Sequence, residues 1–243
     1  MKRSTFQKIA FCTLAVGVLA TSQSVLAHTN LTKRTVEEGT TVYNDAAVGH
    51  GCEDAPVIAN SVVFPDGTDS TVSIGGAVVE GALVTDYIEG VPAIKNVISN
   101  AAFKKSAVAH GRADKAVGIH SWNGSVAAHD TVGLVPMMIG GVKIIDGSCA
   151  KSVIFKVAVA DICRITKAAK FTDSTAVNFW TPFVEGSLFN RADGSSEATS
   201  LTVTRTPTSA LPNDCGEGVD VVVTPSAAQL NHDMPIPSVW PKK

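Results

Sequence analysis

The stretch SVIFKVAV at Ser152–Val159 is the strongest fold signal in the chain. It is rich in β-branched and aromatic residues and has the length of a strand. Helical apolar spacing is scarce in the rest of the sequence. Runs of similar composition recur between clusters of Gly, Pro, Asn and Asp, at Val57–Phe64, Thr71–Ile74, Ala77–Thr85, Val142–Ile145, Leu201–Thr206 and Val219–Thr224. The sequence therefore predicts a mainly β fold with antiparallel, sandwich-like sheets, long loops and little helix.

The segments between these runs carry weaker signals. Pro65-Asp66-Gly67 indicates a turn, and Asp146-Gly147 between two apolar runs favours a tight hairpin. We expect one short helix at Asn96–Lys105. The remaining long segments are expected as extended loops and a surface tail, at Ala109–Gly141, Phe171–Glu197 and the Pro-rich Pro235–Pro241.

The first 27 residues have the pattern of a cleavable secretion signal. Lys2, Arg3 and Lys8 form a positive start, an apolar run of about 12 residues follows, and Val25-Leu26-Ala27 offers small residues for the cleavage. A membrane-spanning helix needs about 20 apolar residues, so we expect none. The prediction is a signal peptide at 1–27 and one secreted domain at 28–243 that starts at His28.

Removal of this signal leaves 17 basic and 22 acidic residues, a formal net charge of −5, which argues against a nucleic-acid partner. Four cysteines remain: Cys52, Cys149, Cys163 and Cys215. An even number of cysteines in an oxidising compartment indicates two disulfides, in one of three pairings.

Familiar enzyme motifs are missing from the sequence. It has no HExxH, no GxSxG, no Walker loop and no dinucleotide fingerprint, so the chain is not expected to be an enzyme. Acidic loops at Asp66–Asp69, Asp193–Glu197 and Asp214–Asp220 offer oxygen donors to calcium without EF-hand spacing, and surface turns explain them as well.

The most informative cluster is His120-Ser121-Trp122. Residues i and i+2 of an extended segment point to one side, so this imidazole and indole share a face. A half-buried tryptophan beside a surface histidine is the plainer explanation. His50, in Gly49-His50-Gly51-Cys52, is a second candidate metal ligand, because a disulfide at Cys52 would hold it rigidly; a turn histidine beside a structural cystine is the alternative.

Three further histidines are candidate ligands. Cleavage after Ala27 would leave the imidazole and the α-amine of His28 on one residue, which is a bidentate clamp for Cu(II), unless the terminus frays. His110 and His129 are further possibilities, and a solvated loop position is the simpler reading of each. Imidazole suits copper, zinc and nickel, and an oxidising setting favours copper without selecting it.

Two resemblances appear at these residues. Ala27-His28-Thr29, Val48-Gly49-His50-Gly51-Cys52-Glu53 and Val62–Gly67 resemble the opening of YcnI-type periplasmic copper-binding domains, over about 40 residues. The whole chain more closely resembles the copper-repressible surface proteins of methane-oxidising bacteria, the CorA and MopE group. In that group a tryptophan lies two positions from a histidine, and His120-Ser121-Trp122 matches this pattern.

The second resemblance implies a Cu(I) site of two histidines and a tryptophan oxidised to kynurenine. In this chain the pattern supplies His120 and Trp122. His50 is the choice for the second, distant histidine, and His28 is the alternative. It also implies a haem peroxidase that oxidises Trp122. The expected function is therefore copper acquisition or scavenging in the periplasm or at the outer cell surface, and the alternatives are an amino-terminal-histidine copper oxidase or chaperone and a metal-free surface or adhesion protein.

Overall fold

The computed structural model describes residues 28–112, 114–127, 129, 131–164, 173 and 175–237. The predicted signal peptide and the end of the Pro-rich tail lie outside these residues. The strands are β1 (Asn30–Leu31), β2 (Thr35–Glu37), β3 (Val42–Val48), β4 (Val57–Val63), β5 (Thr71–Ile74), β6 (Ala77–Val78), β7 (Ile94–Asn96), β8 (Phe103–His110), β9 (Ala116–Val126), β10 (Gly133–Ile139), β11 (Ala150–Ile162), β12 (Val177–Trp180), β13 (Thr199–Thr204) and β14 (Val219–Thr224). A 3-10 helix, η1 (Val84–Asp86), and one α-helix, α1 (Ala227–Asp233), complete the described elements.

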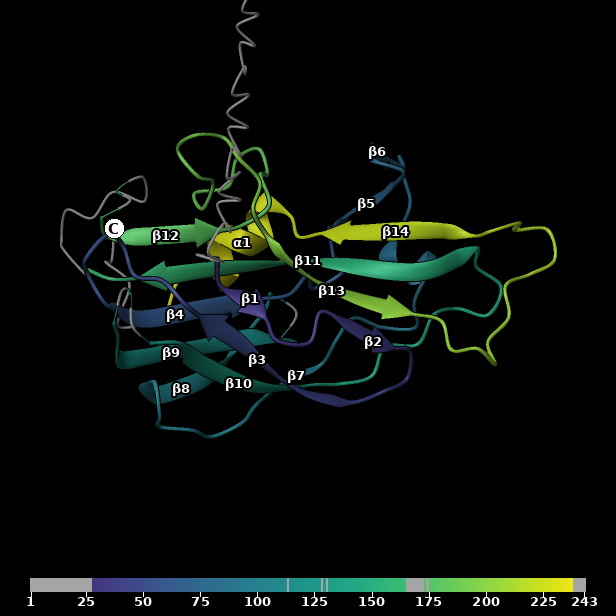
Figure 1. Cartoon of the computed structure of the whole chain (residues 1–243). Helices are drawn as coiled ribbons and strands as arrows, with labels where there is room; N and C mark the ends of the chain where they lie inside the picture. Colours follow the sequence, from purple (N-terminus) through teal and green to yellow (C-terminus); the bar gives the residue numbers. More distant parts are fainter. Residues whose placement is uncertain are drawn as a thin grey trace, which may run out of the picture.

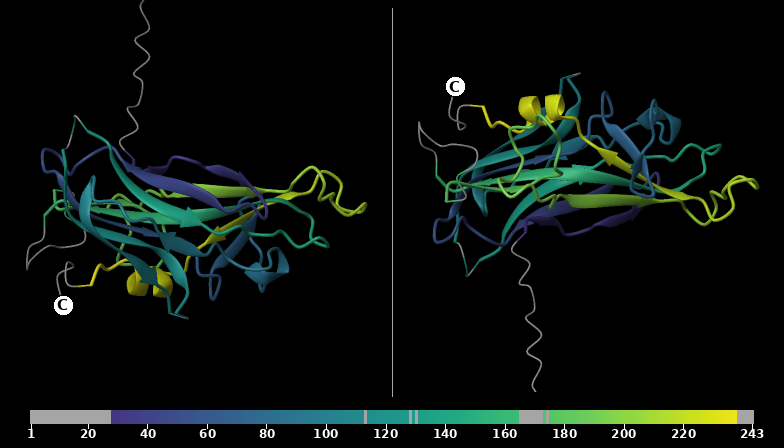
Figure 2. Two further views of the ribbon diagram at one scale, coloured as in Figure 1. Left: turned by 90° about the horizontal axis from the view of Figure 1, so that it is seen from below. Right: turned by 90° about the horizontal axis from the view of Figure 1, so that it is seen from above.

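Two sheets pack face to face (Figure 1). The smaller sheet has the order β1-β3-β10-β7, and the larger has the path β6-β5-β14-β11-β4-β9-β8, with β12, β13 and β2 attached beside β11. The pairs β11–β14 and β13–β2 are parallel and the other pairs are antiparallel. Figure 2 shows β1 and β3 on one side of the large sheet and α1 on the other. The expected mainly β, sandwich-like fold is confirmed.

The long strand β11 connects both halves of the large sheet. Its first half pairs with β13 and β14, and its second half pairs with β4 and β12. The four cysteines form the two expected disulfides, Cys52–Cys163 and Cys149–Cys215. Cys149 immediately precedes β11 and Cys163 immediately follows it, so a disulfide lies at each end of the strand. Both bonds are compatible with an extracytoplasmic protein.

The two faces of the large sheet bury separate apolar clusters. The first lies between the sheets and includes Val62, Phe155 and Trp180. The second lies on the opposite face, where α1 covers it, and includes Ala160 and Leu230. Within the described residues, no helix has the length and apolarity needed to cross a membrane.

Most strand predictions on the larger sheet are confirmed. Thr71–Ile74 and Val219–Thr224 match β5 and β14, and the runs beginning at Val57, Ser152 and Leu201 lie in β4, β11 and β13 with small shifts. Two predicted strands are longer than the structure shows. Ala77–Thr85 contains only the two-residue β6 and part of η1, and Val142–Ile145 contributes only a bridge from Ile144 to Ile88.

The expected helix at Asn96–Lys105 is wrong, because this segment contains the end of β7 and the start of β8, where pairing with neighbouring strands overrides helix propensity. The expected loop at Ala109–Gly141 is also wrong, since it holds the end of β8 and all of β9 and β10. Strand β9 is buried on both faces from Val117 to Ser121, so it lacks the alternation of a half-buried strand.

The expected turn at Asp146-Gly147 and the irregular segment within Phe171–Glu197 agree better with the structure. Asp146-Gly147 forms a turn, in which Ser148 N donates to Ile145 O at 3.0 Å, although no hairpin follows from it. The described part of Phe171–Glu197 is irregular apart from β12.

Candidate functional site

His50 lies in the loop between β3 and β4, and several contacts fix this loop. The Cys52–Cys163 disulfide ties it to the end of β11, and Cys52 and Ala55 exchange two backbone hydrogen bonds. Asn178 Nδ2 on β12 donates to Gly51 O at 2.8 Å. The rigid frame predicted for His50 is therefore present.

The hydrogen bond of the His50 ring defines its chemistry. Nδ1 lies 2.5 Å from Gly51 O, and a carbonyl oxygen can only accept, so Nδ1 carries the proton. In the neutral ring, Nε2 then has a free electron pair. Among the described residues, no hydrogen bond occupies Nε2. This is the state in which an imidazole binds a metal.

His129 is the aromatic neighbour of His50. The two ring centroids lie 5.8 Å apart with planes at 83°. His129 Nε2 lies 3.5 Å from Asp54 Oδ1, and both side chains are largely exposed. The structure thus brings together two of the histidines considered from sequence.

Asp161 on β11 forms the polar centre of this end of the sandwich. Its carboxylate is fully buried, with no cation bonded to it among the described residues, and accepts from Thr29 Oγ1, Asn60 Nδ2 and Trp180 Nε1, each at 2.6 Å. Burial raises the pKa of Asp161, although these hydrogen bonds and the nearby charge of His50 oppose the change. Asp161 therefore fastens the chain after His28 to the large sheet.

His28 stacks on the other polar element of this region, Trp180. The ring centroids are 4.5 Å apart, and His28 Nε2 lies 3.2 Å from Glu197 Oε2. Arg191 lies over the same indole, 5.5 Å from its centroid, and pairs with Glu197 at 3.3 Å. His28 is thus packed against Trp180 and Glu197.

His120 and Trp122 share one face of β9, as the sequence pattern predicts. Their strand partners Ser61 and Ala59 on β4 are also two residues apart, without a bulge between them. His120 is only 6 % exposed, and its Nε2 donates to Asp233 O at 2.9 Å. Burial lowers the pKa of His120, which favours its neutral form. Trp122 is half-buried and packs against the second apolar cluster.

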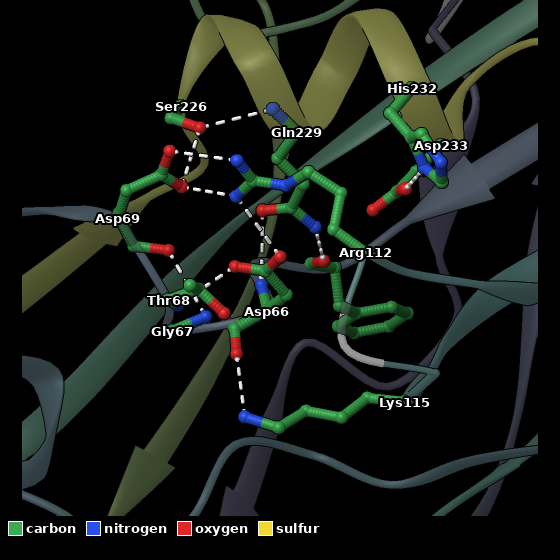
Figure 3. A network of polar contacts seen from close by, with 12 residues as sticks. Asp66, Gly67, Thr68, Asp69, Arg112, Lys115, Ser226, Gln229, His232 and Asp233 are labelled. Atoms are coloured by element: carbon green, nitrogen blue, oxygen red, sulfur yellow. Dashed lines mark hydrogen bonds and ion pairs between the residues drawn. The ribbon is translucent and has the colours of Figure 1, made fainter.

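Helix α1, which covers this face, is held by the polar network in Figure 3. Arg112 bonds both Asp69 and the buried Asp66, and Asp69 accepts from Ser226 Oγ at the start of α1, at 2.7 Å. Gln229 Oε1 accepts a hydrogen bond from the backbone N–H of Asp66 at 3.0 Å. Arg112 lowers the pKa of Asp69 and provides the positive charge beside the loop that was considered for calcium.

The predicted ligands therefore occupy two places. His50 lies beside His129 near Asp161, whereas His120 and Trp122 lie beneath α1. His110, next to Asp114 at 3.2 Å, is a separate exposed residue. Among the described residues, no group of three or more His, Cys, Asp or Glu side chains is placed to hold a metal ion.

Sequence reasoning missed Asp161 and its bond to Trp180. A lone Asp at the end of an otherwise apolar run was the available signal, because a carboxylate in a buried strand needs partners. The pairing of His50 with His129 had no local signal, since 79 positions separate them in the chain. No protein-family model matches the chain, and no curated protein is similar to it in sequence.

Proposed function

We propose that this chain is an exported copper-binding protein that holds Cu(I) through histidine nitrogen, with His50 as its principal ligand. The signal-like start of the sequence and the two disulfides support export. Copper acquisition or scavenging is the role that the resemblance to the CorA and MopE group implies for such a protein.

The observation that carries this proposal is the fixed state of His50. Its loop is anchored by a disulfide and by Asn178, and its Nδ1–H is committed to Gly51 O, so that Nε2 is left as an electron-pair donor. Hydrogen bonding of one ring nitrogen to an oxygen is the usual arrangement that orients a metal-binding histidine. Little conformational freedom is lost when such a ligand binds.

A second candidate site uses His120 and Trp122. Their common face on β9 favours it, and oxidation of Trp122 to kynurenine would supply an aromatic amine that an intact indole lacks. A haem peroxidase is the partner proposed for this reaction. His28 is a third candidate, because the contact of Nε2 with Glu197 leaves Nδ1 available beside a new α-amine.

Titration of purified protein with Cu(I) against a chromogenic Cu(I) chelator tests the function. We expect His50→Ala to lose most of the affinity and the exposed control His110→Ala to retain it. Peptide mass mapping of protein from the native host tests the second site, which requires kynurenine at Trp122 and intact Trp180. Wild-type protein that fails to compete for Cu(I) would leave the metal-free surface protein as the better description.

A further inference from the structure

We propose that His129 is the second protein ligand of this copper site, so that Cu(I) binds between His50 and His129 with Asp54 as an orienting carboxylate. This inference rests on the proposed function and replaces His120 as the partner of His50. It concerns two loops that the fold brings together, the one between β3 and β4 and the one between β9 and β10.

The separation of the rings fits a two-coordinate ion. With metal–nitrogen bonds of about 2 Å, two imidazoles in a linear arrangement have centroids about 6 Å apart. The observed centroids are 5.8 Å apart, and the ring planes, at 83° to each other, cross in a line that both can share with an ion. Two stacked rings would hide their nitrogens from a shared ion.

One nitrogen of each ring faces an oxygen atom, which leaves the other nitrogen for the metal. Nδ1 of His50 donates to Gly51 O, and Nε2 of His129 faces the Asp54 carboxylate. Gly51 O and the Asp54 carboxylate can only accept, so a neutral ring that keeps its proton on the nitrogen facing the oxygen has its electron pair on His50 Nε2 or on His129 Nδ1. A carboxylate on the distant nitrogen also makes an imidazole a stronger electron donor.

The surroundings favour Cu(I) over Zn(II). Within the described part of the chain, no third His, Cys, Asp or Glu completes a cluster around this pair, and zinc sites are normally four-coordinate. Cu(I) has a filled d shell and accepts two nitrogen donors. The carboxylate of Asp54, 3.5 Å from His129 Nε2, provides negative charge beside the pair.

Access also distinguishes His129 from His120. The His129 side chain is 61 % exposed and His50 is half-buried, so an ion can reach both from solvent. His120 is buried beneath α1, and its Nε2 is bonded to Asp233 O. An ion could reach the buried His120 only if α1 moved, which would break the bond of Ser226 to Asp69 and the bond of Gln229 to Asp66.

The test compares His50→Ala, His129→Ala and Asp54→Asn with wild type in Cu(I) competition titrations, with His110→Ala as the matched exposed His–Asp control. Loss of an orienting carboxylate typically weakens metal affinity about 10- to 100-fold, so Asp54→Asn is expected at about tenfold and His129→Ala at more than about 100-fold. X-ray absorption of the Cu(I) protein should show two nitrogen neighbours. Circular dichroism confirms that each variant is folded.

Each outcome has a clear meaning. A large loss for both His50→Ala and His129→Ala, with an unchanged control, supports the site. If His50→Ala loses affinity but His129→Ala does not, the inference is overturned while the proposed function stands, and His120→Ala becomes the next variant. If the wild type binds no Cu(I), both are refuted.

Discussion

Replacement of Asp161 tests the polar centre of the sandwich. Asp161→Ala removes the acceptor of three buried donors: Thr29 Oγ1, Asn60 Nδ2 and Trp180 Nε1. Each of these three residues is at most 5 % exposed, so water cannot replace the lost bonds without rearrangement. An orphaned buried donor costs about 1–3 kcal/mol, so we expect the loss of three partners in Asp161→Ala to lower the free energy of unfolding by about 3–9 kcal/mol.

Asp161→Asn should behave differently. Its amide oxygen can accept from Thr29 and Trp180, and its NH2 group faces Asn60. Asn60 Oδ1 is buried without a partner, so a half-turn of the Asn60 amide would let it accept from the new NH2. The three bonds to residue 161 are then kept, and the unpartnered buried atom of Asn60 becomes its NH2 nitrogen instead of Oδ1, so we expect a cost of about 1 kcal/mol at pH 4.

The pH dependence gives a second readout. Burial raises the pKa of Asp161 above its ordinary value of 3.8, so the folded state binds this proton more tightly than the unfolded state. The resulting stabilisation is complete below about pH 3.8 and is lost as the pH rises through the folded-state pKa. Asp161→Asn lacks this loss, so it should gain stability relative to wild type between pH 4 and pH 8.

Urea unfolding of the oxidised proteins at both pH values measures these differences. The reasoning is refuted if Asp161→Ala costs less than about 1 kcal/mol, below the penalty of even one orphaned donor. It is equally refuted if Asp161→Asn is as damaging as Asp161→Ala, or if the difference between Asp161→Asn and wild type does not change with pH.

Three further predictions concern the frame around the site, each measured by urea unfolding. Gly118→Ala places a Cβ 1.9 Å from Val62 O and should cost about 3 kcal/mol by separating β4 from β9, whereas Gly90→Ala, in open space, should be nearly neutral. The double variant Cys149→Ser/Cys215→Ser opens a loop closed over a separation of 66 residues and should cost about 4 kcal/mol on the chain-entropy account; equal stability would contradict it. Arg112→Gln leaves the buried Asp66 short of a bond and should cost about 2 kcal/mol. Because Arg112 lowers the pKa of Asp69, that deficit should shrink as the pH falls below 3.8, and a deficit that grows there would be contrary evidence.

The strands could be predicted from the sequence where they consist of β-branched and apolar residues along their whole length. The predicted bounds of β5 and β14 match the structure to the residue, because each run of Thr, Val and Ile is followed directly by turn-forming residues. β9 was missed, because Gly118 and Gly124 interrupt its pattern. Those glycines are needed for close packing, since a Cβ on Gly118 would meet Val62 O and one on Gly124 would meet the Phe103 ring.

The candidate site was only partly predictable for a related reason. The local frame of His50 is encoded within a few residues, and the disulfide that fixes it could be expected from the cysteine count. The common face of His120 and Trp122 follows from strand periodicity alone. The neighbour of each side chain depends on which strands pair across the sheet, and this long-range choice placed His129 next to His50 and Asp233 next to His120.

The disulfides at the two ends of β11 also determine the covalent topology of the chain. Cys52–Cys163 and Cys149–Cys215 close two rings that overlap, and the segment they share, 149–163, contains the whole of β11. A protease that cuts once anywhere between Cys52 and Cys215 therefore opens one ring or passes through the shared segment, and in every case the two fragments remain linked. The nicked protein would migrate as one molecule until it is reduced, so a single cleavage need not release any part of the sheet.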